Sequence, residues 1–278
     1  MEPEARGEGR GARGARGKGR KEKFQSKIQN PKSKIPLPLT AIILAGGASS
    51  RMGEDKALLT IEGVPLLRIV CDVAIALCNP VYVVTPWIER YQHLLSPKCQ
   101  FIQEVPLYEG LGAGGWGLGA ELPRGRGAED LGDLEKNYQV RAHSCAPLPI
   151  TNSPLVGFAQ GLAWVKTEWV LLLACDLPRL RVEVLQDWAT CLASADSNAI
   201  ALLTHGAKGW DPLCGFYRRS CLNALTQYIN SGGRSFQHWL AQHSVQVLFL
   251  PDAQMLFNCN TPADYAQLNT KGDGKAIP

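Results

Sequence analysis

The chain has 278 residues, 45% of them hydrophobic, and a formal net charge of +4. This length can bury one large core or two smaller ones. No stretch approaches the roughly 20 consecutive apolar residues of a membrane span, and no apolar segment of a secretory signal follows the basic N-terminus. We therefore expect a cytoplasmic protein with no membrane partner.

The positive charge is concentrated at the N-terminal end. Residues 1–34 hold 11 Lys and Arg against 4 Glu, a charge of +7, which leaves −3 (4 − 7) for the rest of the chain. Residues 1–39 also lack apolar periodicity, so they are predicted to form a disordered basic tail. Weak attraction to RNA or to a membrane surface is the alternative for this tail. Nothing else in the chain favours a nucleic-acid partner.

The nine cysteines are predicted to be core residues in a reducing compartment. None belongs to a Cys-x-x-Cys pair, their number is odd, and most lie inside apolar runs. This spacing supports neither a disulfide framework nor a zinc site. The five histidines show no metal-binding spacing either, so we expect them on the surface or in ordinary packing.

From residue 40 onwards, short apolar runs alternate with segments of helical spacing. Strands are predicted at 41–44, 81–84, 100–104, 169–174, 199–203, 212–217 and 245–250. Helices are predicted at 65–77, 87–95, 154–165, 181–193, 220–229 and 236–242, with a last helix opening at Thr261. This alternation predicts one α/β domain over residues 40–270 with a parallel, doubly wound sheet, followed by a short tail at 271–278.

The alternation is interrupted between residues 107 and 153. This segment is rich in Gly and Pro, has a charged centre, and shows little periodicity. A structureless segment of such length is unusual inside a compact domain, and the strand–helix pattern resumes after it. We expect a surface insertion or a disordered loop, with an active-site lid as the alternative.

The first apolar run, residues 41–44, leads into a glycine-rich loop. In this loop Gly46 and Gly47 are followed by Ala48 and two serines, so no side chain is large. Such a backbone can turn successive N–H groups toward one point and bind a phosphate. The common P-loop is excluded, because its Gly-Lys-Ser/Thr ending is missing. Arg51 and Lys56 then add two positive charges, which together with the loop predict a nucleoside triphosphate site.

Asp176 follows the most apolar strand of the chain, residues 169–174. Ligands of open α/β sheets lie beyond the carboxyl ends of the strands, so Asp176 and the glycine loop are expected at the same edge. Mg²⁺ is usually held by one or two carboxylates together with substrate phosphates. Taken alone, Asp176 could equally be a helix cap or a turn residue, but beside the glycine loop it is predicted to bind magnesium.

The loop and the residues after it resemble a known signature. The run reads Leu44-Ala45-Gly46-Gly47-x-Ser49-x-Arg51-Met52-Gly53-x-Asp55-Lys56-Ala57-Leu58-Leu59. It is similar to the signature of Rossmann-like nucleotidyltransferases, and most similar to that of the molybdenum cofactor guanylyltransferases. Residues 153–157, 175–178 and 258–262 resemble further motifs of that family in the same order. The resemblance covers residues 40–268 without the insertion and implies a three-layer α/β fold with a mostly parallel sheet.

The resemblance implies an activity. The enzyme would transfer GMP from GTP to the phosphate of molybdenum-bound molybdopterin and release pyrophosphate. Such chemistry depends mainly on positioning and on neutralising phosphate charge, for which Arg51, Lys56 and an Asp176-held Mg²⁺ are suited. An outward-pointing charge is the alternative for Arg51, and a surface cation is the alternative for Lys56. Molybdenum-inserting proteins and acceptor molybdoenzymes are further partners in this interpretation.

Individual binding roles also follow from the resemblance. Backbone groups of Leu44, Ala45 and Gly46 would contact the guanine nucleotide, and Lys56 would bind its triphosphate. Asp176 would contact the nucleotide as well as the metal. An acid after the third strand contacts GTP in this family, and Glu104 stands nearest to that position, where the family more often has Asp. The segment containing Asn258 and Asn260 would face the molybdopterin.

Three alternatives remain open on the sequence alone. The first keeps the fold but uses another base or acceptor, as a cytidylyltransferase or a sugar-phosphate nucleotidyltransferase does. Gly47 favours guanine, because cytidine-using relatives more often have alanine in the glycine pair. The second is a catalytically silent nucleotide-binding scaffold, which the intact Lys56 and Asp176 disfavour. The third concerns Asp211, which either opens a turn or lies at the substrate end of a strand.

Overall fold

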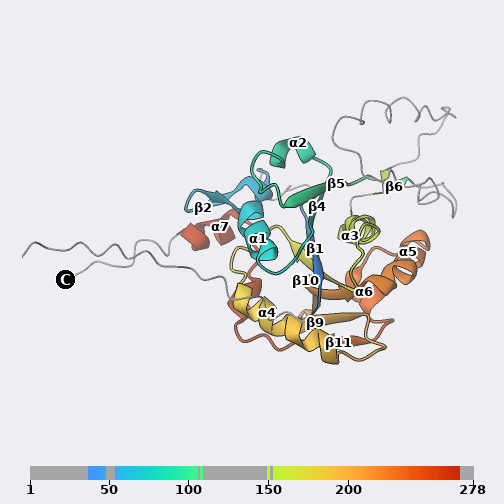
Figure 1. The fold of residues 1–278 in the computed structure, drawn as a ribbon. Coiled ribbons are helices and arrows are strands. Elements are labelled where there is room, and N and C mark those ends of the chain that lie inside the picture. Colours follow the sequence, from blue (N-terminus) through green and yellow to red (C-terminus); the bar gives the residue numbers. More distant parts are fainter. Residues whose placement is uncertain (1–36, 48–53, 106, 109–148, 151–152, 270–278) are drawn as a thin grey trace, which may run out of the picture. The chain divides into compact units, whose positions relative to one another are not determined.

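The computed structural model describes residues 37–47, 54–105, 107–108, 149–150 and 153–269. Its main sheet contains β1 (Leu39–Leu44), β4 (Val81–Thr85), β5 (Cys99–Gln103), β8 (Trp169–Ala174), β9 (Ala201–Gly206), β10 (Gly209–Arg218) and β11 (Val245–Val247). The strand order is β11-β9-β10-β8-β1-β4-β5 (Figure 1). Only β10 runs antiparallel to its neighbours, which confirms the mostly parallel sheet.

The two central strands place their carboxyl ends side by side. Leu44 at the end of β1 pairs with Ala174 at the end of β8, and all six residues of β8 are buried. Continuous burial on both faces is characteristic of a central parallel strand, which is why both segments are apolar without alternation. The loops that follow β1 and β8 therefore emerge at the same edge, as the sequence predicts.

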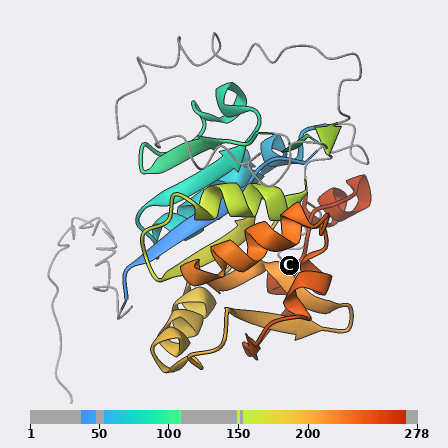
Figure 2. The same cartoon turned by 90° about the vertical axis from the view of Figure 1, so that its right-hand side faces the viewer.

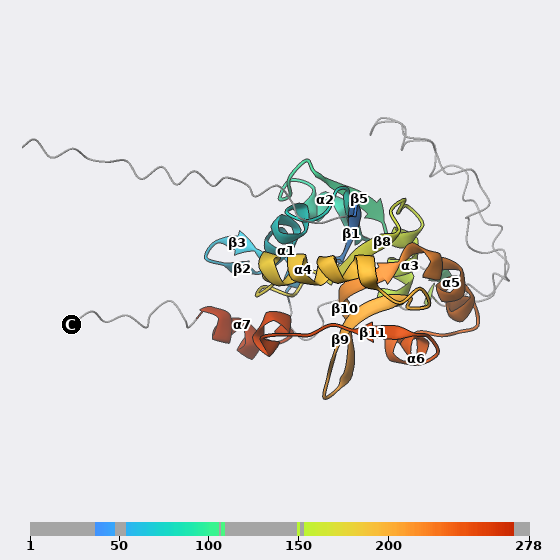
Figure 3. The same ribbon diagram turned by 60° about the horizontal axis from the view of Figure 1, so that its bottom comes forward.

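Helices cover both faces of the sheet and give the expected three layers. On one face lie α1 (Leu66–Ile75), α2 (Ile88–Tyr91) and α4 (Val182–Thr190); on the other lie α3 (Pro154–Leu162), α5 (Leu222–Asn230) and α6 (Phe236–Leu240). Figures 1 and 3 show α1 and α4 opposite α3 and α5, and Figure 2 looks onto the α3–α5 face. Neighbouring residues of β1 point to opposite layers, Ile43 to the first and Ile42 to the second.

A short hairpin was not predicted. Strands β2 (Thr60–Ile61) and β3 (Val64–Pro65) pair antiparallel around Glu62 and Gly63, which have φ values of 51° and 79°. Two positive φ values are typical of a tight hairpin turn, but Glu at the first position lacks the usual Asn or Asp signal. Pro65, expected in the first helical turn, instead ends β3 and precedes α1.

The ends of the predicted insertion are paired. Strands β6 (Leu107–Tyr108) and β7 (Pro149–Ile150) form a two-stranded antiparallel ladder. The segment was expected to be structureless, but these two short parts of it are paired. Residues 109–148 lie outside the described residues, and the choice between insertion and lid stays a prediction. The structure begins its first strand at Leu39, inside the predicted tail of residues 1–39, because that side chain is buried in the core. The other tail predictions concern residues 1–36 and 271–278, which are also outside the description.

The last helix, α7 (Pro262–Asn269), packs beside the β2–β3 hairpin. Tyr265 donates its hydroxyl to the Thr60 carbonyl at 2.7 Å, and Leu59, Leu66 and Cys259 form a small buried cluster there. The eight cysteines within the described residues are free thiols, six of them buried. No helix in the described ranges is long and apolar enough to cross a membrane.

Candidate active site

Three chain segments meet at the carboxyl edge of β1 and β8. The 3₁₀ helix η1 (Lys56–Leu58) follows the glycine loop, and the turn of Cys175 and Asp176 follows β8. The third segment, residues 258–260, precedes α7. Cys175 donates its N–H to the Leu44 carbonyl at 3.2 Å, and Cys259 donates its N–H to the Asp176 carbonyl at 3.1 Å. The Asp176 turn is thus held between the end of β1 and the third segment.

Lys56 lies at the centre of this arrangement. Its Nζ donates a hydrogen bond of 2.6 Å to Asn260 Oδ1 and lies 3.9 Å from Asp176 Oδ2. The Lys56 and Asp176 side chains are only 20% and 16% exposed. The alternative that Lys56 is an ordinary surface cation is therefore wrong. Three residues that are widely separated in the sequence form one polar cluster.

The two carboxylate oxygens of Asp176 have different surroundings. Its Oδ2 faces Lys56, but its Oδ1 is buried without a hydrogen-bond partner among the described residues. Burial raises the pKa of Asp176, and the nearby Lys56 ammonium partly offsets this increase. A buried unpartnered carboxylate oxygen is costly, and a bound cation would remove that cost. Asp176 does not cap a helix, since α4 begins at Val182 after the N-cap residue Arg181.

Glu104 reaches the glycine loop from the next strand but one. It follows β5 and is only 6% exposed, and burial raises its pKa to about 7. A Cβ atom on Gly46 would lie 2.1 Å from Glu104 Oε2 and 2.9 Å from Pro86 Cδ. Position 46 is therefore tightly packed, because a Cβ atom there would force the Glu104 carboxylate to move and would also press on the rigid Pro86 ring. The structure places Glu104 against the glycine loop, and its contact with GTP stays a prediction.

The other loop residues differ in what they offer. Ala45 donates its N–H to the Val84 carbonyl at 2.9 Å, so this amide is already used by the sheet and Gly46 is the first amide beyond it. A Cβ atom on Gly47 would meet nothing within 4 Å, so packing among the described residues does not demand glycine there. Arg51 lies outside the described residues, and its role stays a prediction.

The side chains of Asn258 and Asn260 lie in different parts of the site. Asn260 binds Lys56, and its backbone N–H is accepted by Asp264 Oδ2 at 3.0 Å. The same carboxylate oxygen accepts the N–H of Thr261 at 2.8 Å, and the Asp264 N–H is bound by Thr261 Oγ1 at 3.2 Å. This reciprocal capping opens α7 as predicted. It also anchors the backbone that presents Asn260 to Lys56.

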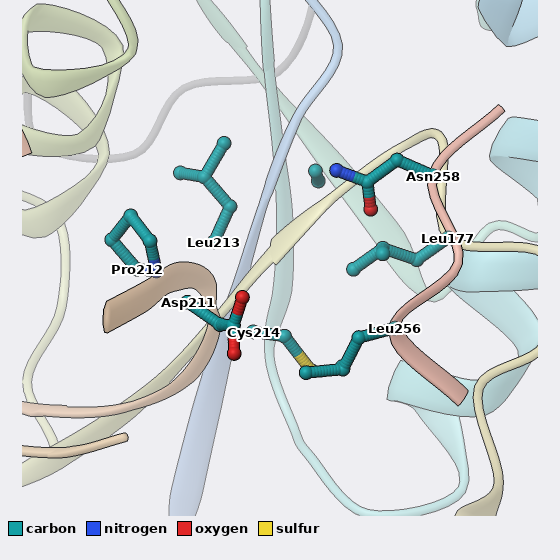
Figure 4. Close-up of a pocket in the computed structure, with 8 residues that line it drawn as sticks. Leu177, Asp211, Pro212, Leu213, Cys214, Leu256 and Asn258 are labelled. Atoms are coloured by element: carbon teal, nitrogen blue, oxygen red, sulfur yellow. The ribbon is translucent and has the colours of Figure 1, made fainter. Parts of the chain in front are cut away.

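Asn258 instead lines a small pocket beside the end of β8. The pocket has a volume of about 120 Å³ and is lined by Ala174, Leu177, Asp211, Pro212, Leu213, Cys214, Leu256 and Asn258 (Figure 4). Asp211 and Asn258 are its two polar side chains and reach it from different segments (Figure 4). Asp211 lies within β10 and not at a turn, and its Oδ2 accepts the Thr204 hydroxyl at 2.8 Å.

Sequence reasoning assigned no role to two residues that lie near Lys56. Asp55 accepts the hydroxyl of Tyr91 at 2.7 Å and the N–H of Ala57 at 3.1 Å. Asp55 belongs to the signature run, directly before Lys56, but the sequence assigned it no role of its own. Nothing in the sequence marks Tyr91, because its partner is 36 residues away.

The site combines a glycine-flanked central strand with a lysine and a buried carboxylate at the carboxyl edge of a mostly parallel sheet. In open α/β sheets this edge is where ligands bind, and these groups are suited to phosphates and to a cation that accompanies them. Fold and site together define a nucleotide-binding α/β protein.

Comparison with known proteins narrows this class. A family model described as "MobA-like NTP transferase domain" matches residues 41–116 and 128–247. A "Probable molybdenum cofactor guanylyltransferase" from Trichormus variabilis is 53% identical over 235 residues, which cover 84% of this chain and 92% of the relative. A protein of the same name from Synechococcus elongatus is 36% identical over 232 residues, which cover 84% of this chain and 98% of the relative.

Among solved structures, molybdopterin-guanine dinucleotide biosynthesis protein A from Archaeoglobus fulgidus superposes with a TM-score of 0.57. At 18% identity, over 84% of this chain and 97% of that one, this likeness shows a shared fold. The chain therefore belongs to the MobA-like NTP transferase family and, within it, to the molybdenum cofactor guanylyltransferases. The predicted family and the nucleotidyltransferase class are thereby confirmed, and the reading as a guanylyltransferase is favoured over the alternatives.

Proposed function

We propose that this nucleotidyltransferase uses GTP to transfer GMP to the phosphate of molybdenum-bound molybdopterin. The products are the guanine dinucleotide form of the cofactor and pyrophosphate. The observation that carries the proposal is the cluster of Lys56, Asn260 and Asp176 beside the glycine loop. The names of the relatives support the choice of reaction.

The reaction forms a bond between an acceptor phosphate oxygen and the α-phosphorus of GTP. The bond from that phosphorus to the bridging oxygen breaks, and pyrophosphate leaves with the bond's electrons. Several negative charges approach one another, so placement and charge neutralisation dominate catalysis. Lys56 would bind a phosphate oxygen of the triphosphate with its ammonium, while Asn260 and Asp176 hold that ammonium at the sheet edge.

Asp176 is the residue that would hold Mg²⁺. Its unpartnered Oδ1 fits such a ligand, and a bound cation would favour the ionised carboxylate. Mg²⁺ usually combines one or two carboxylates with phosphate oxygens and water, and it would neutralise charge on the bound triphosphate. Burial of Asp176 strengthens its electrostatic interaction with both the cation and Lys56, because little water screens the site.

The loop and Glu104 would hold the nucleoside part of GTP. We assign the first available loop amide to Gly46, because the Ala45 N–H is bonded to Val84. Glu104 lies against Gly46, so a nucleotide bound along the loop would meet its carboxyl group. The guanine base has two hydrogen-bond donors, N1–H and the 2-amino group, and a carboxyl group such as that of Glu104 can accept hydrogen bonds from both. Gly47 would leave room for the base, since no described atom occupies that space.

The pocket of Asp211 and Asn258 would take part of the acceptor. It adjoins Ala174, which lies two residues before Asp176, so an acceptor bound there would be close to the triphosphate. The ring of a pterin carries adjacent N–H donors and a carbonyl acceptor, which suit one carboxylate and one amide. Molybdenum-inserting proteins and recipient molybdoenzymes remain predicted partners, as the cytoplasm remains the predicted location.

The decisive experiment supplies the purified chain with molybdopterin, molybdate, Mg²⁺ and each nucleoside triphosphate in turn. We expect the guanine dinucleotide as the main product, with stoichiometric pyrophosphate. Asp176→Ala should abolish pyrophosphate release, whereas Asp187→Ala, which removes an exposed acid of α4, should not. A preference for CTP would overturn the choice of base, and unchanged turnover in Asp176→Ala would overturn the assignment of the site.

A further inference from the structure

Asp55 connects Lys56 to a buried tyrosine. Its Oδ1 accepts the N–H of Ala57 at 3.1 Å and thereby caps the 3₁₀ helix η1, whose first residue is Lys56. Its Oδ2 accepts the hydroxyl of Tyr91 at 2.7 Å. The Asp55 side chain is 18% exposed, so both oxygens are held in a largely buried place. The carboxylate thus joins two elements that are 36 residues apart.

Tyr91 is well suited to fix this carboxylate. It ends α2 and is fully buried, with a 0% exposed side chain. Burial, together with the Asp55 carboxylate, raises the pKa of Tyr91 far above its usual range, so its hydroxyl stays a neutral donor. A hydrogen bond from a neutral donor to a carboxylate is stronger than one between two neutral groups.

A third partner of the Asp55 side chain, Arg90, interacts more weakly. Arg90 Nη1 lies 3.6 Å from Asp55 Oδ2, but the arginine side chain is 53% exposed. Exposed ion pairs contribute little, because water screens them and the long side chain loses freedom. Arg90 also stacks on the Trp87 ring, with 4.7 Å between its guanidinium carbon and the ring centroid. Tyr91 is therefore the principal anchor of the Asp55 side chain.

This anchor matters because η1 is short. A three-residue 3₁₀ helix closes few hydrogen bonds of its own, here Leu58 N–H to the Asp55 carbonyl and Leu59 N–H to the Lys56 carbonyl. Its orientation depends on the cap at Asp55. Lys56 is the first residue of η1, so the backbone conformation of η1 sets the direction in which its side chain leaves the backbone. The several rotatable bonds of that side chain then act from this fixed starting point.

We propose that Tyr91 is a positioning residue for Lys56, acting through the Asp55 carboxylate and the cap of η1. The inference rests on the proposed function in one respect, namely that Lys56 binds the triphosphate. Tyr91 itself touches no substrate in this scheme. It keeps the ammonium of Lys56 close to Asn260 and Asp176, so that little conformational freedom is lost when phosphates bind.

The test compares Tyr91→Phe with Tyr228→Phe. Both changes remove one hydroxyl, but Tyr228 donates to the Ser235 carbonyl at 3.2 Å, on α5 and away from Lys56. Binding of Mg²⁺–GTP and of Mg²⁺–tripolyphosphate is measured by calorimetry in the intact chain. We expect Tyr91→Phe to weaken both by roughly fivefold, a size typical of a lost positioning hydrogen bond, and Tyr228→Phe to leave both within twofold.

The Lys56→Ala background distinguishes positioning from general damage. If Tyr91 acts through Lys56, Tyr91→Phe will change binding by less than about twofold once the ammonium is gone, because coupled residues are not additive. Asp55→Asn, which keeps an oxygen for the Ala57 N–H, provides a milder second variant. We expect it to weaken binding and to cancel most of the further effect of Tyr91→Phe.

The inference would be overturned if Tyr91→Phe reduced binding affinity equally in the wild-type and Lys56→Ala backgrounds. It would also be overturned if Tyr91→Phe reduced affinity no more than Tyr228→Phe does. The two probes separate this result from a failure of the proposed function. If the wild type binds tripolyphosphate but not GTP, the choice of nucleotide is wrong, and the tripolyphosphate data alone decide the role of Tyr91. If it binds neither, Lys56 does not bind a triphosphate and the inference falls.

Discussion

Lys56 Nζ donates a hydrogen bond of 2.6 Å to Asn260 Oδ1, across 204 residues of sequence. The contact joins the segment after the glycine loop to the segment that opens α7. It holds the only side-chain cation of the cluster around Asp176 that lies within the described residues.

Asn260→Ala should impair nucleotide binding. Without the Asn260 oxygen, the Lys56 ammonium loses its 2.6 Å hydrogen bond, while the contact to Asp176 is longer at 3.9 Å, so its position becomes less defined. We expect the KM for GTP to rise about tenfold, which corresponds to one good charge-assisted hydrogen bond. Asn223→Ala, at an exposed position of α5, serves as the control. If both variants bind GTP like the wild type, the contact has no role in binding.

Gly46→Ala should destabilise the chain, and Gly47→Ala should not. The new Cβ at position 46 would lie 2.1 Å from Glu104 Oε2, whereas the one at position 47 meets no described atom within 4 Å. Overpacking of this kind costs about 1–3 kcal/mol, which urea unfolding can measure. Gly47→Ala should keep its unfolding midpoint and shift the ratio of GTP to CTP affinity toward CTP. A Gly46→Ala variant as stable as the wild type would contradict the tight packing of Pro86 and Glu104 around position 46.

Glu104 should make the stability fall as the pH rises from about 5 to 7. Burial raises its pKa from 4.5 to about 7 in the folded chain, so the unfolded chain loses this proton first. Protonated Glu104 therefore adds no penalty to the folded state below about pH 5. As the pH rises to about 7, the free energy of unfolding decreases, because Glu104 can ionise more easily in the unfolded chain. Glu104→Gln cannot ionise, so its stability relative to the wild type should increase across the window by about 1–3 kcal/mol.

The measurement for Glu104 is urea unfolding of both chains at several pH values, without nucleotide. Asp176 also has a raised pKa, but it is present in both chains, so its contribution cancels in the difference. Curves that stay parallel from pH 5 to 7 would show that Glu104 ionises normally in the folded chain.

Asp211→Ala should affect the acceptor and not the nucleotide. Asp211 lines the pocket with Asn258, and its carboxylate is held by the Thr204 hydroxyl. We expect the KM for molybdopterin to rise about tenfold, while the Kd for Mg²⁺–GTP stays within twofold. Thr204→Val, which loosens the carboxylate without removing it, should have a smaller effect of the same kind. A matching loss of GTP affinity would place Asp211 with the nucleotide.

Sequence patterns predicted the layered sheet and its ligand edge with few errors. The reason is that β1 and β8 are buried on both faces, which forces continuous apolar runs at 41–44 and 169–174. The same patterns missed the β2–β3 hairpin, because its turn at Glu62 and Gly63 takes its conformation from the chain around it. Family resemblance marked Glu104 as the acid nearest to a GTP-contacting position, but its close contact with Gly46 could not be inferred from residue order.

The sequence by itself determined the fold class, the family, and the residues that carry charge at the site. Periodicity and motif spacing are local, so they can be read without knowing any contact. Only the tertiary structure decided that Lys56 pairs with Asn260 and that Asp55 is held by Tyr91. It also placed Asn258 beside Asp211. These contacts depend on how distant segments approach one another, and that is set by packing of the whole core on both faces of the sheet.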